Sequence, residues 1–208
     1  MITQQSSVAQ FLDDLASKAS TPGGGSAAAI MGAMGAALVS MVSNLTVGKD
    51  KYAAVEPEMR HLLARADALR EDLLAAVAAD IRVFDEVMAA YALARAPEAV
   101  IPARTAAIQT ALRAATEVPL ACARLCAEVI ALSRRAAANG NPNVISDAGV
   151  AVMAAYAGLK SAALNVYINI KALKDRDFAA QSRAEIDALC AAAEQASMEI
   201  YALVKSKL

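Results

Sequence analysis

Apolar residues recur every three or four positions along most of this chain, which is the spacing of the buried face of an α-helix. No strand is predicted. We therefore expect an all-α fold, a single-domain bundle of about six helices that covers residues 1–208 and includes one very long helix. The predicted helices span about residues 7–18, 26–46, 57–96, 98–139, 143–174 and 176–205.

Proline and glycine residues mark where these helices should end. Pro22-Gly23-Gly24-Gly25 should form a loop before the second helix, and Asn139-Gly140-Asn141-Pro142 should end the fourth. Pro57 falls near the start of the very long third helix, where proline is tolerated. Pro119 falls inside the fourth helix and should kink or divide it, because proline lacks the backbone N–H that a helix needs.

The second predicted helix has a bulky side and a small side. Met31, Met34, Leu38, Met41 and Leu45 form the bulky side, whereas Ala29, Gly32, Ala36 and Ser40 form the small one. Small residues at this spacing allow a neighbouring helix to approach closely. The small side also offers more apolar surface than a monomer would comfortably expose, so we predict a homodimer.

The thirty residues from Ala19 to Gly48 carry no charge, a length that is enough to span a bilayer. The glycine loop near the start of this stretch, its many small residues and the lack of a second comparable span favour a buried central helix instead. We therefore expect no membrane association.

Composition and charge narrow the function further. Of the 208 residues, 58% are hydrophobic and 4% aromatic, and the net charge of −1 comes from scattered residues, which gives no footprint for nucleic acid. Three cysteines and no secretory signal favour reduced, buried thiols in a cytoplasmic protein. His61 is the one histidine, so we expect that no four-ligand zinc site can be assembled from the usual residues, and we expect no metal.

Asp80 is the first candidate for chemistry, because it interrupts the apolar stripe of the third helix. It falls between Val77 and Phe84, and the stripe also includes Leu73, Val87 and Tyr91. A carboxyl among apolar side chains has a raised pKa, which suits proton transfer near neutral pH. The alternative is a structural aspartate that caps a loop or pairs with an arginine.

Two further segments place polar groups unusually. One face of the fifth helix has Asp147 at one end, Asn165 and Asn169 at the other, and small residues between. The alternative to a functional face is a close helix–helix seam, with capping by Ser146 and Asp147. The loop Thr21-Pro22-Gly23-Gly24-Gly25-Ser26 could bring backbone N–H groups and a helix N-terminus to a ligand. Its alternative is a flexible connector.

Together these segments resemble the cyclodeaminase/cyclohydrolase family of folate enzymes, which includes methenyltetrahydrofolate cyclohydrolases and the cyclodeaminase domain of formiminotransferase-cyclodeaminases. The resemblance covers nearly the whole chain. It rests on the glycine loop, Leu45-Thr46-Val47-Gly48-Lys49 with Tyr52, Asp80 with Phe84, Asn139-Gly140-Asn141, Ser146-Asp147, and Asn165 with Asn169.

The resemblance implies an all-α homodimer that binds a tetrahydrofolate derivative and needs no metal or other cofactor. It implies either hydrolysis of 5,10-methenyltetrahydrofolate to 10-formyltetrahydrofolate or cyclisation of 5-formiminotetrahydrofolate with loss of ammonia. The chain has no room for a formiminotransferase domain, which favours the cyclohydrolase. The rival class is a helical interaction module without catalysis.

The same resemblance, combined with side-chain chemistry, suggests roles for single residues. Asp80 would be the catalytic proton shuttle. Gly23, Gly24, Gly25 and Ser26 would orient the ligand, and Asp147, Asn165 and Asn169 would bind the pterin edge. Lys49 would meet the glutamate tail, and Lys51 and Arg104 are further tail candidates.

Overall fold

A computed structural model describes residues 7–208, and every regular element in that range is helical. The long α-helices confirm the expected all-α class with about six helices. In chain order the elements are α1 (Val8–Leu15), α2 (Gly24–Asn44), the 3₁₀ turn η1 (Asp50–Val55), α3 (Glu56–Ala92), η2 (Glu98–Val100), α4 (Ile101–Asn139), η3 (Pro142–Val144), α5 (Ile145–Ala172) and α6 (Arg176–Lys205).

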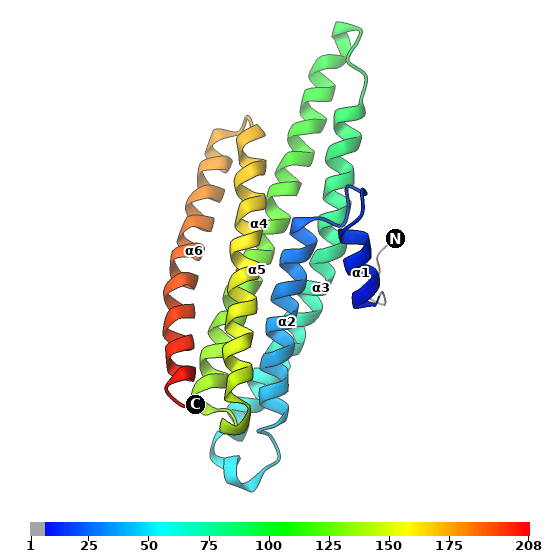
Figure 1. The fold of residues 1–208 in the computed structure, drawn as a ribbon. Coiled ribbons are helices and arrows are strands. Elements are labelled where there is room, and N and C mark those ends of the chain that lie inside the picture. The colour runs from blue at the N-terminus through cyan, green and yellow to red at the C-terminus, as the bar shows by residue number, and fades with distance from the viewer. Residues whose placement is uncertain (1–6) are drawn as a thin grey trace.

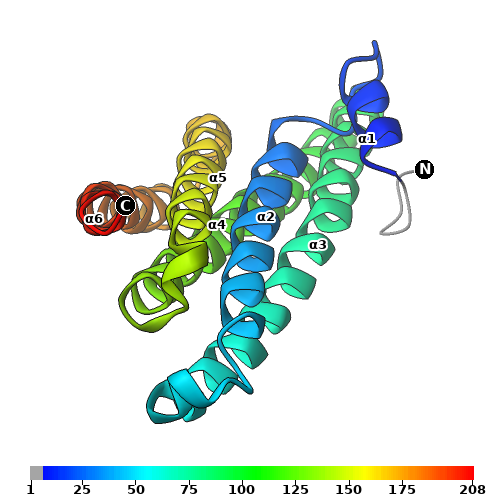
Figure 2. The same ribbon diagram turned by 60° about the horizontal axis from the view of Figure 1, so that its bottom comes forward.

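Four helices, α2 to α5, form the centre of the bundle (Figure 1). The second view shows α6 at one edge against α4 and α5, and the short α1 at the other edge beside α3 (Figure 2). The C-terminal end of α3 and the N-terminal end of α4, which η2 connects, extend past the start of α2 (Figure 1). We call these two helix ends the arm.

The expected very long helix exists, and it has a partner of similar length. Helix α3 has 37 residues and begins with Pro57 in its first turn, as predicted. Helix α4 has 39 residues and continues through Pro119, so of the two expected outcomes, a kink or a division, the division is wrong. Ser7 caps α1, whose Gln10 N–H donates to the serine hydroxyl at 3.1 Å.

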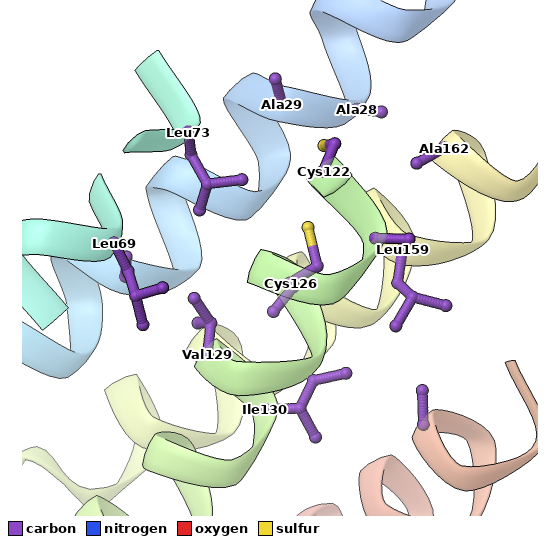
Figure 3. Close-up of a cluster of buried hydrophobic side chains, with 14 of the residues drawn as sticks. Ala28, Ala29, Leu69, Leu73, Cys122, Cys126, Val129, Ile130, Leu159 and Ala162 are labelled. Atoms are coloured by element: carbon purple, nitrogen blue, oxygen red, sulfur yellow. The ribbon is translucent and has the colours of Figure 1, made fainter. Parts of the chain in front are cut away.

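The small side of α2 is buried inside this protomer. Ala29, Gly32 and Ala36 lie in the core, and a side chain added at Gly32 would overlap the Cys126 sulfur and Leu73. Figure 3 shows residues from four helices meeting there: Ala28 and Ala29, Leu69 and Leu73, Cys122 and Cys126, and Leu159 and Ala162. The small side therefore serves packing within one chain and is not the dimer surface that the sequence suggested.

The bulky side of α2 faces outward instead. Met34 and Met41 are 56% and 41% exposed. Helices α2 and α5 are each long and apolar enough to cross a membrane, which corrects the expectation of a single such span. About half of each apolar window is buried within the bundle, which agrees with the expectation of a core helix.

The apolar stripe of α3 is fully buried before Asp80 and less buried after it, where Val87 is only partly buried. Leu73 and Val77 are in the core, but Phe84 and Tyr91 are 36% and 39% exposed. These two positions were wrongly expected to be buried. The reason is that α2 begins beside Asp80, so the arm residues that follow on α3 have no α2 residue against them.

All three cysteines are free and buried, as expected. Within residues 7–208, no cluster of three or more histidine, cysteine or acidic side chains is arranged to hold a metal ion.

Candidate functional site

The N-terminus of α2 lies at the centre of the candidate site. Gly23 is the N-cap residue, and it has no side chain that could cap the first turn. Free N–H groups at a helix start carry a partial positive charge and bind anionic or polar groups. Gly24 is exposed, whereas Ser26 is completely buried two residues later.

The Ser26 hydroxyl donates a hydrogen bond of 2.8 Å to Oδ2 of Asp80 on α3. Burial raises the pKa of the Asp80 carboxyl, and hydrogen bonds from the hydroxyl and backbone of Ser26 oppose that rise. None of the ion pairs among residues 7–208 includes Asp80. The alternative in which an arginine pairs with this carboxylate is therefore not observed.

Gly25 allows the close approach of α2 to Asp80. A Cβ atom at this position would overlap the Asp80 carboxylate, whereas one at Gly24 would make only an ordinary contact, 4.0 Å from the Asn165 amide. Gly23, Gly24 and Gly25 do not have a positive φ. Close packing is thus the reason for glycine at position 25.

The two asparagines of α5 lie at the same end of the bundle. Asn165 approaches Gly24, and its amide donates to the Ser161 carbonyl at 3.0 Å. Asn169, one turn further, donates from Nδ2 to the Ala115 carbonyl of α4 at 2.6 Å. Neither asparagine is fully buried, so both amides retain surface that a ligand can reach.

Between its polar ends, α5 forms the close seam that was the alternative reading of this face. A side chain at Gly158 would collide with the Ala28 carbonyl of α2, and one at Gly35 would collide with the Ala151 carbonyl. Capping by Ser146 or Asp147 is not observed, since the N-cap of α5 is Val144 without a side-chain hydrogen bond.

Lys49 lies at the opposite end of α2, in the segment from Leu45 to Tyr52 that we call the lysine loop. Gly48 has φ +74°, a left-handed conformation that favours glycine, and it turns the chain so that Lys49 is exposed. Asp147 is in the first turn of α5 at this same end. Because α2 has 21 residues, about 30 Å separates the lysine loop from Gly24.

Asn141 fastens the lysine loop to the bundle. This buried residue accepts a hydrogen bond from the Tyr52 hydroxyl at 2.9 Å, and it donates to the Leu45 carbonyl at 3.0 Å and to the Thr46 hydroxyl at 2.9 Å. In the sequence, Asn141 belongs to a predicted helix stop and to the Asn139-Gly140-Asn141 segment of the family resemblance, and neither gives it a partner. A pairing of Asn141 with Thr46 and Tyr52 has no signal in the local sequence.

Arg104 has a structural partner. Its guanidinium donates to the carbonyls of Leu93 and Tyr91 at 3.1 and 2.9 Å, and it thereby caps the C-terminal end of α3. These bonds hold the arm together at η2 and provide a structural explanation for Arg104 in place of a tail contact.

The structure therefore divides the predicted site residues into two groups. Gly23, Gly24, Gly25, Ser26, Asp80, Asn165 and Asn169 gather at the start of α2 and form what we call the aspartate site. Lys49 and Asp147 lie at the other end of the bundle. One protomer does not bring the two groups together.

Comparison with known proteins decides the family. A family model described as formiminotransferase-cyclodeaminase matches residues 7–188, which is most of the chain. The chain belongs to this family. It is 56% identical over 198 residues to a methenyltetrahydrofolate cyclohydrolase from Methylorubrum extorquens, a match that covers 95% of each protein.

Two further similar proteins share less sequence with the chain. The chain is 33% identical to the formimidoyltransferase-cyclodeaminase of Rattus norvegicus, and the match covers 97% of this chain but 37% of that longer protein. Its structure resembles a crystal structure of formiminotetrahydrofolate cyclodeaminase from Thermotoga maritima, with a TM-score of 0.88, 29% identity and 97% of each chain covered. This likeness agrees with the all-α fold.

Proposed function

We propose that this protein hydrolyses 5,10-methenyltetrahydrofolate to 10-formyltetrahydrofolate, and that Asp80 moves the protons. The observation that carries the proposal is the Asp80 carboxyl, which is desolvated, has no ion-pair partner in the described residues and is held by Ser26 at a helix N-terminus. The 56% identity to a methenyltetrahydrofolate cyclohydrolase supports this reaction.

In the first step, the Asp80 carboxylate accepts a proton from water as the oxygen adds to the cationic methenyl carbon. The positive charge of the substrate and the negative charge of Asp80 disappear together, which favours the step in a poorly solvated site. The product is a neutral carbinolamine in which the former methenyl carbon carries a hydroxyl group and remains bonded to N5 and N10.

In the second step, protonated Asp80 donates to N5 as the bond between this carbon and N5 breaks. The hydroxyl group loses its proton to solvent and becomes the formyl carbonyl on N10. The reaction therefore consumes one water, releases one proton and returns Asp80 to the carboxylate. A carboxyl with a raised pKa can both accept and donate at neutral pH.

The other residues of the aspartate site bind and orient the substrate. The N–H groups of Gly24 and Gly25 donate to the developing carbonyl oxygen, and Asn165 and Asn169 face the pterin edge. Ser26 acts on Asp80 through its hydrogen bond. The proposed reaction needs no metal or cofactor besides tetrahydrofolate, and we expect a soluble cytoplasmic enzyme that binds no nucleic acid.

A cyclodeaminase is the second candidate, since several relatives carry that name at 29–37% identity. A paired assay separates the activities. Loss of methenyl absorbance above the uncatalysed rate supports the cyclohydrolase, whereas ammonia release from 5-formiminotetrahydrofolate supports the cyclodeaminase. If the pure protein neither binds nor converts a reduced folate, both proposals fail in favour of a helical interaction module.

The distance between the lysine loop and the aspartate site supports a homodimer. The outer side of α2 and α5, called here the α2/α5 face, exposes six large apolar side chains, and α2 contributes no charge to it. A group of exposed apolar side chains on one face is typical of a protein–protein interface. Its residues are Met34, Met41, Val150, Met153, Leu164 and Ile168.

A twofold axis perpendicular to α2 would make the copies antiparallel across this face. Each lysine loop would then lie beside the aspartate site of the other copy, where Lys49 and Asp147 can act on one folate. A twofold axis parallel to α2 would leave the two groups about 30 Å apart, as they are in one protomer.

Mixed dimers test this arrangement. Asp80→Asn and Lys49→Glu chains, with different tags, are coexpressed and the heterodimer is isolated. If sites are shared, one site carries both changes and the other carries none, so activity returns to about half of wild type. Activity that stays as low as in the single-variant homodimers contradicts shared sites, and a stable monomer in sedimentation at micromolar concentration contradicts the dimer itself.

A further inference from the structure

Pro119 lies in the middle of α4 and is buried there. Because proline has no N–H, the carbonyl of Ala115 four residues earlier loses its normal helical donor. Ala115 is itself only 7% exposed, so water is a poor substitute. A buried carbonyl without a donor is unfavourable, and this one requires a partner from elsewhere in the fold.

Asn169 of α5 provides that donor. Its Nδ2 atom lies 2.6 Å from the Ala115 carbonyl oxygen. A carbonyl can only accept, so this bond determines which end of the amide faces α4. Nδ2 is committed to Ala115, and Oδ1 is the end of the Asn169 side chain that remains to accept a hydrogen bond.

The register of the helices places Asn169 just past the start of α2. Helices α2 and α5 are antiparallel, with Gly24 beside Asn165 and Gly32 beside Gly158. One more turn along α5 reaches Asn169, and one turn along α3 from Asp80 reaches Phe84. Both are thus beyond the point at which α2 begins, on the open side of the aspartate site.

We propose that Pro119 is a positioning residue of the folate site. By leaving the Ala115 carbonyl without a helical donor, it fixes the Asn169 amide so that Oδ1 accepts a hydrogen bond from the substrate. The tetrahydropterin ring offers N–H donors along its edge, which is the chemistry that this acceptor selects. The inference rests on the proposed function, which places Asn169 against the pterin.

Pro119→Ala tests the inference, because alanine returns an N–H to the Ala115 carbonyl and releases Asn169. We expect a higher melting temperature, an unchanged kcat and a KM for methenyltetrahydrofolate that rises about 2- to 10-fold, the worth of one hydrogen bond. Pro102→Ala is the matched control. Pro102 lies in the first turn of α4, where proline frees no carbonyl, so this change should alter neither the melting temperature nor KM.

Asn169→Ala completes a double-mutant cycle that does not depend on one variant. In the wild-type background it should lower the melting temperature, since the Ala115 carbonyl loses its donor. It should also raise KM, since the substrate loses the Oδ1 acceptor. In the Pro119→Ala background, Asn169→Ala should no longer lower the melting temperature, and it should raise KM by a smaller factor. Coupling in both quantities supports the positioning role.

An unchanged KM in folded Pro119→Ala, or KM effects that simply add, overturns the inference and leaves Pro119 and Asn169 as a structural pair. The wild-type assay separates this from the proposed function. If wild type does not turn over methenyltetrahydrofolate, the proposed function fails, whereas normal turnover without KM coupling removes only the role of Pro119.

Discussion

Two serine–aspartate pairs join α2 to α3 with nearly the same hydrogen bond. Ser26 donates to Asp80 at 2.8 Å at the start of α2, and Ser40 donates to Asp67 at 2.9 Å near its end. Both serines are buried and both aspartates are on α3. The two regions therefore differ in what surrounds the carboxylate, while the bond that holds it is the same.

Asp67 has a cation within reach and Asp80 has none among the described residues. Arg70, one turn along α3, lies 3.3 Å from the Asp67 carboxylate, whose side chain is 44% exposed. Asp80 is desolvated, and its pKa is raised. The comparison teaches that the serine sets the position of each carboxylate, whereas burial and nearby charge determine whether it suits proton transfer.

Among changes that keep both aspartates, the largest expected effect comes from Gly25. Gly25→Ala places a methyl group on the Asp80 carboxylate, so either the carboxylate or α2 must move. A misplacement of this kind lowers kcat/KM by about 10²-fold. Steady-state assays with circular dichroism check the rate and the fold together.

Gly24→Ala is the control for this change, because its methyl group makes only an ordinary contact near Asn165. We expect a much smaller loss of activity and no loss of stability. Equal activity for the two variants would show that the close approach at Gly25 is unimportant for catalysis.

Replacing each serine has a smaller expected effect but compares the two pairs directly. Ser26→Ala and Ser40→Ala should each lower the free energy of unfolding by about 1 kcal/mol, because each removes one hydrogen bond. The Ser26 hydroxyl lowers the pKa of Asp80, so its removal raises that pKa. Since the ionised carboxylate is the base, the acid limb of the pH–rate profile should move to higher pH in Ser26→Ala.

Ser40→Ala should leave the pH–rate profile unchanged. Denaturant titration and the pH dependence of kcat/KM separate the two outcomes. A folded Ser26→Ala enzyme with the wild-type acid limb would mean that a group other than Asp80 sets it.

The smallest effect concerns stability. A folded-state pKa above the unfolded value means that the charged carboxylate of Asp80 opposes folding. This penalty decreases as pH falls through the raised pKa and is absent below the ordinary carboxyl value. Asp80→Asn should therefore stabilise the protein at neutral pH, within about 1 kcal/mol, and not in acid. Melting curves at both pH values check the sign, and a loss of stability at neutral pH would contradict it.

Much of the fold could be predicted from local pattern. Helix ends at Pro57 and Asn139 follow from proline and glycine chemistry that acts within a few residues. The side of α2 that is buried could not be predicted in this way. Both sides of that helix are apolar, and only the neighbouring helices determine that Gly32 faces Cys126 while Met34 faces outward.

The sequence predicted candidate residues, and it could not predict which of them the fold brings together. A carboxylate in an apolar stripe marked Asp80, but its contact with Ser26 joins positions 54 residues apart. The donor to the carbonyl that Pro119 leaves without a helical partner likewise comes from Asn169, 50 residues further along the chain. Lys49 and Asp147 belonged to the same motif set, yet the length of α2 places them at the other end of the protomer.

The measurement that tests the central claim most directly is kcat for methenyltetrahydrofolate hydrolysis by Asp80→Asn beside Asp67→Asn, with melting temperatures from the same preparations. For Asp80→Asn we expect a fall of about 10²- to 10⁴-fold in a protein that melts at or above the wild-type temperature. Asp67→Asn should keep its activity and lose stability, since it breaks the contact with Arg70. Near-wild-type turnover by folded Asp80→Asn would contradict the account.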